Sequence, residues 1–133
     1  MLRFTANLSL LFTEVPLQQR FQAAKDQGFK AVEIQFPYEL SADVIRQELD
    51  KQQLKLVLFN VDADDLLQGG EGLAAVPEKK QRFEQAITET VAYAKILKPD
   101  VINILPGRCF DTSLLGEYQQ TLKENLRFAL EAF

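Results

Sequence analysis

The stretch AVEIQF, residues 31–36, decides the fold class of this 133-residue chain. Side chains alternate between the two faces of a β-strand, so Val32 and Ile34 share one face. Glu33 and Gln35 share the other. A strand of a parallel sheet that helices cover on both faces is normally apolar throughout. One polar face therefore indicates a sheet with helices on one side and a mixed surface on the other.

The same kind of short apolar run occurs four times, and each run precedes a longer stretch with helical periodicity. This alternation is typical of parallel βαβ units. Helices are expected to begin near Pro16, Ser41 and Glu78, and a fourth closes the chain. The expected strands are Arg3–Ser9, Ala31–Phe36, Leu54–Val61 and Val101–Leu105.

Three features of the helices and loops are informative. Gly28 suits a left-handed cap at the end of the first helix. The segment 62–76 holds three glycines and is too long for an ordinary connector, so it is expected to be a working loop or a mobile one. An apolar stripe at helical spacing runs along the last helix, over Leu122, Leu126, Ala129 and Phe133.

The polar face continues into the later strands with Asn60 and Asn103. Three leucines have the same parity and weaken the pattern: Leu56, Leu58 and Leu105. A curved sheet fits best, with its apolar face against helices and its mixed face lining the interior of a barrel. A closed (β/α)8 barrel takes about 250 residues, so the chain is expected to be one domain, residues 1–133, that forms the first four βα units of a TIM barrel. Such a half-barrel leaves both edge strands unpaired, so it is expected to associate with a missing half or with a second copy.

Composition narrows the classes of function. There are 15 Lys and Arg residues against 19 Asp and Glu residues, and the net charge of −4 argues against nucleic-acid or anionic-membrane binding. The chain has no histidine, which excludes Ser-His-Asp chemistry and His-rich zinc sites within these residues. The lone cysteine, Cys109, reads as a structural thiol because no histidine can serve as its base. No apolar run typical of a signal peptide or membrane span opens the chain, so a cytoplasmic location is expected.

Glu33 is the most informative carboxylate. An acidic group between Val32 and Ile34 is costly to bury unless it is paired or faces a cleft, so it suggests a site. An ion pair with a neighbouring lysine or arginine is the alternative. Its candidate partners are Lys30, Lys55 and Arg3.

Clustered motifs carry a family resemblance along the whole chain. They are Ala6-Asn7-Leu8-Ser9, Phe12-Thr13-Glu14-Val15-Pro16, Ala31-Val32-Glu33, Phe36-Pro37-Tyr38, Leu58-Phe59-Asn60, Gly72-Leu73-Ala74-Ala75 with Pro77, and Asn125-Leu126-Arg127. Together they resemble the opening half of hydroxypyruvate isomerases and 2-oxo-tetronate isomerases, which belong to the xylose isomerase-like TIM-barrel superfamily.

The resemblance implies an isomerase that interconverts hydroxypyruvate and tartronate semialdehyde through an enediol. It implies a pair of proton-transferring glutamates, and a divalent metal (Mg or Mn) in the complete barrel. Both are expected beyond Phe133, so neither catalytic nor metal-binding residues are expected in this chain, which should be inactive alone.

The resemblance also implies which residues line the pocket for a small sugar acid. Glu78-Lys79 stands where the family has Gly-Arg, so Arg108 is a candidate replacement for binding a substrate carboxylate. Asn7, Glu33 and Asn60 are the expected polar wall, with Phe12, Phe36 and Tyr38 as apolar cover.

Three other interpretations were weighed against the sequence. The first is a non-catalytic, truncated or engineered half-barrel that dimerises or binds small anions. An endonuclease IV-like DNA repair enzyme fits poorly, because it needs histidine ligands and a basic surface. A complete flavodoxin-like domain is disfavoured because a fifth strand and a phosphate-binding glycine loop after the first strand are absent.

Overall fold

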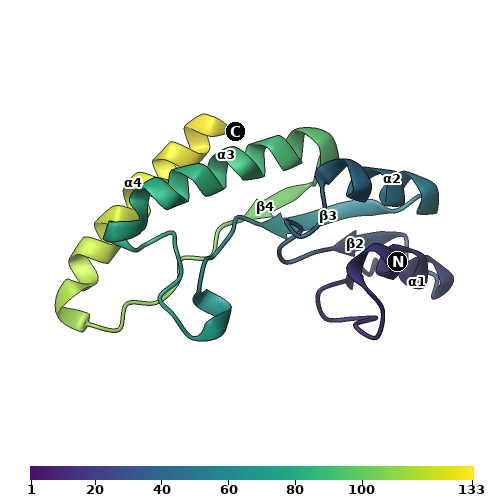
Figure 1. Cartoon of the computed structure of the whole chain (residues 1–133), viewed down its shortest axis with the longest axis horizontal. Helices are drawn as coiled ribbons and strands as arrows, with labels where there is room; N and C mark the ends of the chain where they lie inside the picture. Colours follow the sequence, from purple (N-terminus) through teal and green to yellow (C-terminus); the bar gives the residue numbers. More distant parts are fainter. The chain divides into compact units, whose positions relative to one another are not determined.

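The computed structural model describes residues 1–133 and contains one parallel four-stranded sheet in the order β1-β2-β3-β4 (Figure 1). The strands are β1 (Ala6–Asn7), β2 (Ala31–Glu33), β3 (Lys55–Asn60) and β4 (Val101–Asn103). The α-helices are α1 (Leu17–Asp26), α2 (Ala42–Gln52), α3 (Lys80–Leu97) and α4 (Leu115–Ala132). Short 3₁₀ turns are η1 (Leu66–Gln68), η2 (Pro77–Lys79) and η3 (Thr112–Leu114). The expected α/β class with four parallel βα units is confirmed.

The chain divides into two compact units. Unit 1 comprises Met1–Asn60 and Tyr93–Asn103, and thus holds the sheet, α1, α2 and the end of α3. Unit 2 comprises Val61–Ala92 and Ile104–Phe133, and thus holds the start of α3, α4 and the loops that follow β3 and β4. None of the helices combines the length and apolar content needed to cross a bilayer.

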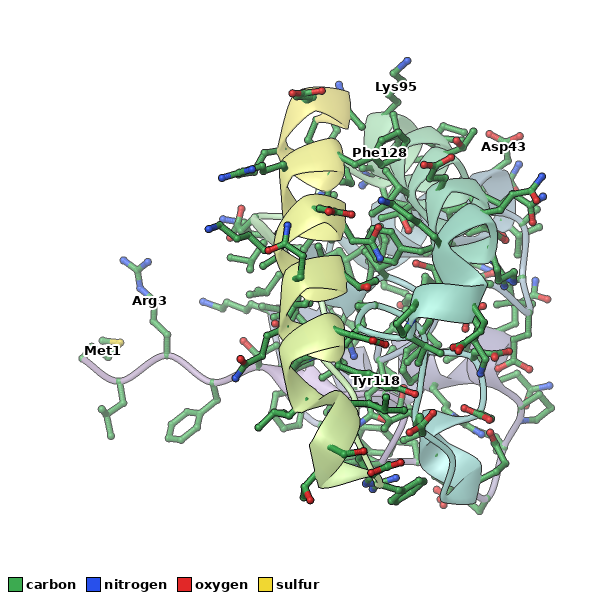
Figure 2. The ribbon with its side chains drawn as sticks, turned by 90° about the vertical axis from the view of Figure 1, so that its left-hand side faces the viewer. Met1, Arg3, Asp43, Lys95, Tyr118 and Phe128 are labelled. Atoms are coloured by element: carbon green, nitrogen blue, oxygen red, sulfur yellow. The ribbon has the colours of Figure 1, made fainter.

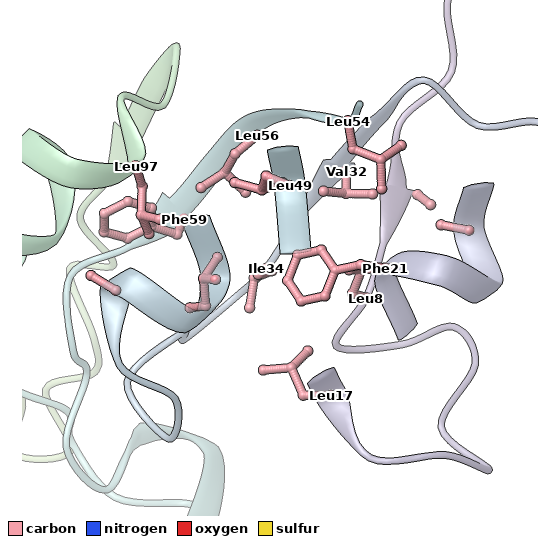
Figure 3. Close-up of a cluster of buried hydrophobic side chains, with 14 residues drawn as sticks. Leu8, Leu17, Phe21, Val32, Ile34, Leu49, Leu54, Leu56, Phe59 and Leu97 are labelled. Carbon is pink, nitrogen blue, oxygen red and sulfur yellow. The ribbon is translucent and has the colours of Figure 1, made fainter. Parts of the chain in front are cut away.

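The helical segments of unit 1 pack on one face of its sheet. Phe21 of α1, Leu49 of α2 and Leu97 of α3 all belong to a single apolar cluster with the strands. Figure 3 shows these helix side chains together with Val32 of β2 and Ile34, which directly follows β2. This one-sided packing agrees with the alternation in the sequence. The cluster residues in the strands or directly beside them are Ala6, Leu8, Val32, Ile34, Leu54, Leu56 and Phe59.

A bulge between β2 and β3 changes one of the predicted face assignments. Val32 pairs with Leu56 but Glu33 pairs with Leu58, so Val57 is the extra residue. Leu56 therefore lies on the helix-covered face with Val32 and is 3% exposed. Its predicted place on the polar face is wrong, because simple alternation does not anticipate a bulge.

The strands are shorter than the sequence pattern predicts. After β1 the chain turns, because the amides of Leu10 and Leu11 both donate to the Asn7 carbonyl, at 3.1 and 2.9 Å. Before β1, Met1 and Arg3 lie on an extended, exposed segment (Figure 2). The strand predicted over Arg3–Ser9 is therefore shorter in the structure, where β1 comprises only Ala6–Asn7.

The predicted helix boundaries in unit 1 are confirmed. Gly28 has a φ of 90°, and the Phe29 amide donates to the Ala24 carbonyl at 3.1 Å, which closes the end of α1. Ser41 caps α2, since its Oγ accepts a hydrogen bond of 3.2 Å from the Val44 amide.

In unit 2, the buried face of α4 is only partly the predicted one. Ala129 is buried, but Leu126 and Phe133 are 39% and 54% exposed. The buried face of α4 also carries a polar contact, since Asn125 Nδ2 donates to the Ala74 carbonyl at 2.9 Å. The buried residues of α4 are Tyr118, Thr121, Asn125 and Ala129.

Candidate functional site

Two rows of side chains cross the open face of the sheet in unit 1. Strand register fixes the first row, since Asn7 pairs with Glu33, Glu33 with Leu58, and Leu58 with Val101. We call this the lower row. Two residues further along each segment lies the upper row, which is polar throughout: Ser9, Gln35, Asn60 and Asn103.

The upper row stands where the strands end. Asn60 and Asn103 are the last residues of β3 and β4, and they pair in register. Gln35 continues the ladder beyond β2, because its carbonyl accepts from the Asn60 amide at 2.9 Å. In α/β barrels the carboxyl ends of the strands carry the active site. The upper row is therefore the candidate site.

Hydrogen bonds organise this row. Asn103 Nδ2 donates to Asn60 Oδ1 at 3.1 Å. The Gln35 amide donates to Ser9 Oγ at 2.8 Å, and the Ser9 amide donates to Asn7 Oδ1 at 2.9 Å. The side-chain nitrogen of Asn60 and the side-chain oxygen of Asn103 face no protein partner. The nitrogen can donate to a ligand oxygen, and the oxygen can accept from a ligand hydroxyl.

Glu33 is half-buried and carries no ion pair. Of the basic residues considered from the sequence as partners, Lys55 instead pairs with Asp100 at 2.8 Å. Glu33 pairs in register with Asn7 and has no counterion, which fits a role in accepting hydrogen bonds from a hydroxylated ligand.

Tyr38 supports the upper row from the other side of the sheet. Its ring meets Phe59 and Tyr93 edge to face, with centroid distances of 6.3 and 5.1 Å. Its hydroxyl donates to the Asn60 carbonyl at 2.5 Å. The structure thus brings Tyr38 to Asn60 through the backbone. Its predicted role as substrate cover stays a prediction.

The other two aromatic residues predicted as substrate cover, Phe12 and Phe36, make no ring contact like those of Tyr38. Phe12 packs against the helix-side cluster and has a φ of 61°. Phe36 is half-exposed, directly after Gln35. Their contact with a substrate also stays a prediction.

Arg108 belongs to unit 2, where it bonds to backbone carbonyls. Its guanidinium Nη1 donates to the carbonyls of Leu66 and Gly70, each at 3.1 Å. The predicted contact of Arg108 with a substrate carboxylate therefore has to compete with these bonds, and it stays a prediction.

Two residues of interest, Asn103 and Tyr118, are not among the predicted site residues. Asn103 is placed on the polar face by parity, but only its bond to Asn60 makes it a site residue. In unit 2, Tyr118 donates to Glu71 Oε1 at 2.7 Å across 47 positions of sequence. No periodicity or motif signals that pairing.

Comparisons with known proteins place this geometry in a family. The family model described as "Xylose isomerase-like TIM barrel" matches residues 21–133. The chain is 38% identical over 131 residues to the 2-oxo-tetronate isomerase of Pectobacterium atrosepticum, covering 98% of this chain and 50% of that protein. It is 36% identical over 129 residues to the hydroxypyruvate isomerase of Escherichia coli, covering 97% and 50%.

A solved structure agrees with the fold. A protein from Brucella melitensis described as "AP endonuclease, family 2" superposes with a TM-score of 0.88 at 37% identity, covering 98% of this chain and 50% of that one. The chain thus spans about half the length of the curated relatives it matches, as four βα units span half of an eight-unit barrel. With its parallel sheet and helices packed on one face, the chain belongs to the xylose isomerase-like TIM-barrel family.

Proposed function

We propose that the chain supplies four βα units of an isomerase that acts on a small sugar acid, with hydroxypyruvate and tartronate semialdehyde as the interconverting pair. The observation that carries the proposal is the 36–38% identity to curated isomerases along almost the whole chain. The polar upper row at the carboxyl ends of the strands supports it, because a hydroxylated acid needs several hydrogen-bonding groups close together.

The chemistry defines what these residues do. A base removes a proton from C3 of hydroxypyruvate, the enediol is reprotonated at C2, and the hydroxyl proton on the C3 oxygen moves to the C2 oxygen. Negative charge develops on the substrate oxygens, and fixed donors stabilise it. Asn60 and Asn103 bind and orient these oxygens, and Glu33 accepts a hydrogen bond from a substrate hydroxyl.

The proton-transferring glutamates are proposed to come from strands that pair with the edges of this sheet. Glu33 is the only carboxylate in the two rows, so the chain does not present a facing pair of acids there. The proposal therefore includes inactivity of the 133-residue chain alone.

A divalent metal, Mg²⁺ or Mn²⁺, belongs to the proposal for the complete barrel. The residues of this chain do not form a full ligand set, because no three Asp, Glu or Cys side chains come close enough to hold an ion. Glu33 with neighbouring amides offers a single carboxylate, so further ligands for the metal would come from the other strands of the barrel.

A second candidate is a non-catalytic half-barrel that pairs with another copy of itself. It is favoured by the strand order, because β1 and β4 each have only one neighbour in the sheet. Two copies related by a twofold axis bring β4 of each beside β1 of the other, in parallel, and close eight strands. Light scattering during gel filtration tests it, with a dimer expected under this candidate and a monomer contradicting it.

The sequence does not favour the activity named in the description of the Brucella melitensis protein, AP endonuclease. Such chemistry acts on DNA, whose phosphates attract basic surfaces. The net charge of −4 and the absence of histidine do not favour it.

Proton NMR with hydroxypyruvate tests the proposed function. Addition of hydroxypyruvate is expected to shift the side-chain amide signals of Asn60 and Asn103 without forming tartronate semialdehyde. Mixing the chain with the carboxyl-terminal half of the Pectobacterium atrosepticum isomerase is expected to produce turnover. Turnover by the chain alone contradicts its inactivity, and no shift together with no turnover in the mixture contradicts the substrate class.

A further inference from the structure

Glu71 joins three segments of unit 2. Its backbone carbonyl accepts from the Arg108 amide at 2.9 Å. Its carboxylate accepts from the Phe110 amide at Oε2, at 3.3 Å, and from the Tyr118 hydroxyl at Oε1, at 2.7 Å. One residue of the loop after β3 thus holds the loop after β4 and the first turn of α4.

Arg108 makes a second set of bonds between the same two loops. Its guanidinium donates to the carbonyls of Leu66 and Gly70, so the loop after β4 also bonds to the turn that precedes Glu71. Both loops lie within unit 2. We call the set Glu71, Arg108, Phe110 and Tyr118 the loop clasp.

Gly107 lets the two loops approach closely. A Cβ at Gly107 would lie 2.2 Å from the Glu71 carbonyl oxygen, and its φ of +92° disfavours any other residue. The clasp thus depends on backbone proximity as well as on side chains.

A small pocket lies against the clasp. It has a volume of about 150 Å³ and is lined by apolar groups, among them Pro106 and Leu122, together with Cys109 and the ring of Tyr118. Tyr118 belongs to both the clasp and the pocket wall. Fixing its hydroxyl on Glu71 therefore fixes one wall of the pocket.

We propose that Glu71 is a positioning residue that makes the loops after β3 and β4 one body and so sets the shape of this pocket. Loops after the carboxyl ends of strands build the active sites of TIM barrels, so this role in catalysis rests on the proposed function. The clasp itself does not, and it is tested without turnover.

Two groups in the pocket report on the Glu71 carboxylate. The hydrogen bond to Glu71, with burial, raises the pKa of Tyr118 to about 12. Burial raises the pKa of the Cys109 thiol, and the charges of Glu71 and Asp111 add to it, while the thiol donates to the Asp111 carbonyl at 3.1 Å. Neutralising Glu71 changes both groups in a defined direction.

The experiment compares Glu71→Gln and Tyr118→Phe with Glu117→Gln. Glu117 is exposed on the first turn of α4 and holds no ion pair, so its variant controls for loss of one charge. Hydrogen exchange at the Phe110 and Arg108 amides is expected to be at least tenfold faster in Glu71→Gln. Alkylation of Cys109 by iodoacetamide at pH 8 is expected to be several times faster, since the thiolate is the reactive form.

Tyrosinate absorbance gives the signature that a merely structural role would not produce. Tyr118 is expected to titrate near pH 12 in the native chain and closer to the ordinary value of 10.0 in Glu71→Gln. Tyr118→Phe removes that transition and keeps the ring, so it stands in if Glu71→Gln fails to fold. Exchange, alkylation and titration that match the Glu117→Gln control overturn the proposal.

Discussion

Asn103 Nδ2 donates to Asn60 Oδ1 at 3.1 Å, which ties the last residue of β4 to the last residue of β3. Asn60 is 7% exposed, and its carbonyl is held by the Tyr38 hydroxyl. Its side chain is therefore fixed before any ligand arrives. Such preorganisation lowers the entropy cost of binding.

Replacing Asn60 with leucine is expected to weaken binding of hydroxypyruvate about fivefold, since one hydrogen bond contributes about 1 kcal/mol. Asn103→Leu is expected to have a similar effect, and the double variant less than the sum, because the two amides bond to each other. NMR titration measures the affinities. Gln22→Leu, at an exposed position of α1, is the control. If all variants bind hydroxypyruvate with affinities within twofold of that of the native chain, Asn60 and Asn103 do not bind the ligand.

The fold was largely predictable because alternation in the strands is a local signal. Val32 and Ile34 are buried under helices, and Glu33 lies on the opposite face, as their parity predicts. The bulge at Val57 was not predictable, because it depends on how β3 pairs with β2. Leu56 was assigned to the wrong face for that reason.

The candidate site was predictable only in part. Asn7, Glu33 and Asn60 follow from strand parity and resemblance, and register brings Asn7 beside Glu33. Contacts between loops leave no periodic signal, so Tyr118 and its bond to Glu71 become visible only in three dimensions.

The apolar cluster of unit 1 gives a direct test of the sheet packing. Phe21 is fully buried, so Phe21→Ala is expected to lower the free energy of unfolding by about 3–5 kcal/mol. Phe4 is 70% exposed in the same unit, and Phe4→Ala is expected to change it by less than about 0.5 kcal/mol. Urea unfolding followed by circular dichroism makes the comparison. Equal effects of the two substitutions would contradict one-sided packing of α1 on the sheet.

Alanine substitutions at Gly107 and Gly69 distinguish the cost of a steric clash from the cost of backbone strain. Both lie in unit 2 with φ near +90°, but a Cβ at Gly69 meets nothing within 4 Å. Gly69→Ala is expected to cost about 1 kcal/mol from its conformation alone. Gly107→Ala is expected to cost about 1–3 kcal/mol more, because its Cβ overlaps the Glu71 carbonyl. Thermal unfolding of the two variants measures the difference, and equal midpoints would mean that the loops separate freely.

Asp65 makes the loop after β3 sensitive to acid. Its Oδ1 accepts from the Gly72 amide at 2.9 Å and lies 3.4 Å from Lys79 Nζ. The Gly72 hydrogen bond, with the Lys79 charge, holds the pKa of Asp65 below its ordinary value of 3.8. A carboxylate whose pKa is lower in the folded state stabilises that state fully above the unfolded value, and this stabilisation is lost as the pH falls through the folded pKa.

Asp65→Asn is therefore expected to lower the unfolding temperature at pH 7, and this difference is expected to shrink as the pH falls below the ordinary aspartate pKa of 3.8. The asparagine oxygen can still accept from the Gly72 amide, so the variant removes the charge that faces Lys79 and keeps the turn. Asp26→Asn, exposed on the last turn of α1 without an ion pair, is the control and is expected to lack this pH-dependent difference. Calorimetry from pH 7 to pH 2 measures the three curves. A gap between the native chain and Asp65→Asn that persists unchanged into acid would show that the Asp65 charge does not stabilise the loop.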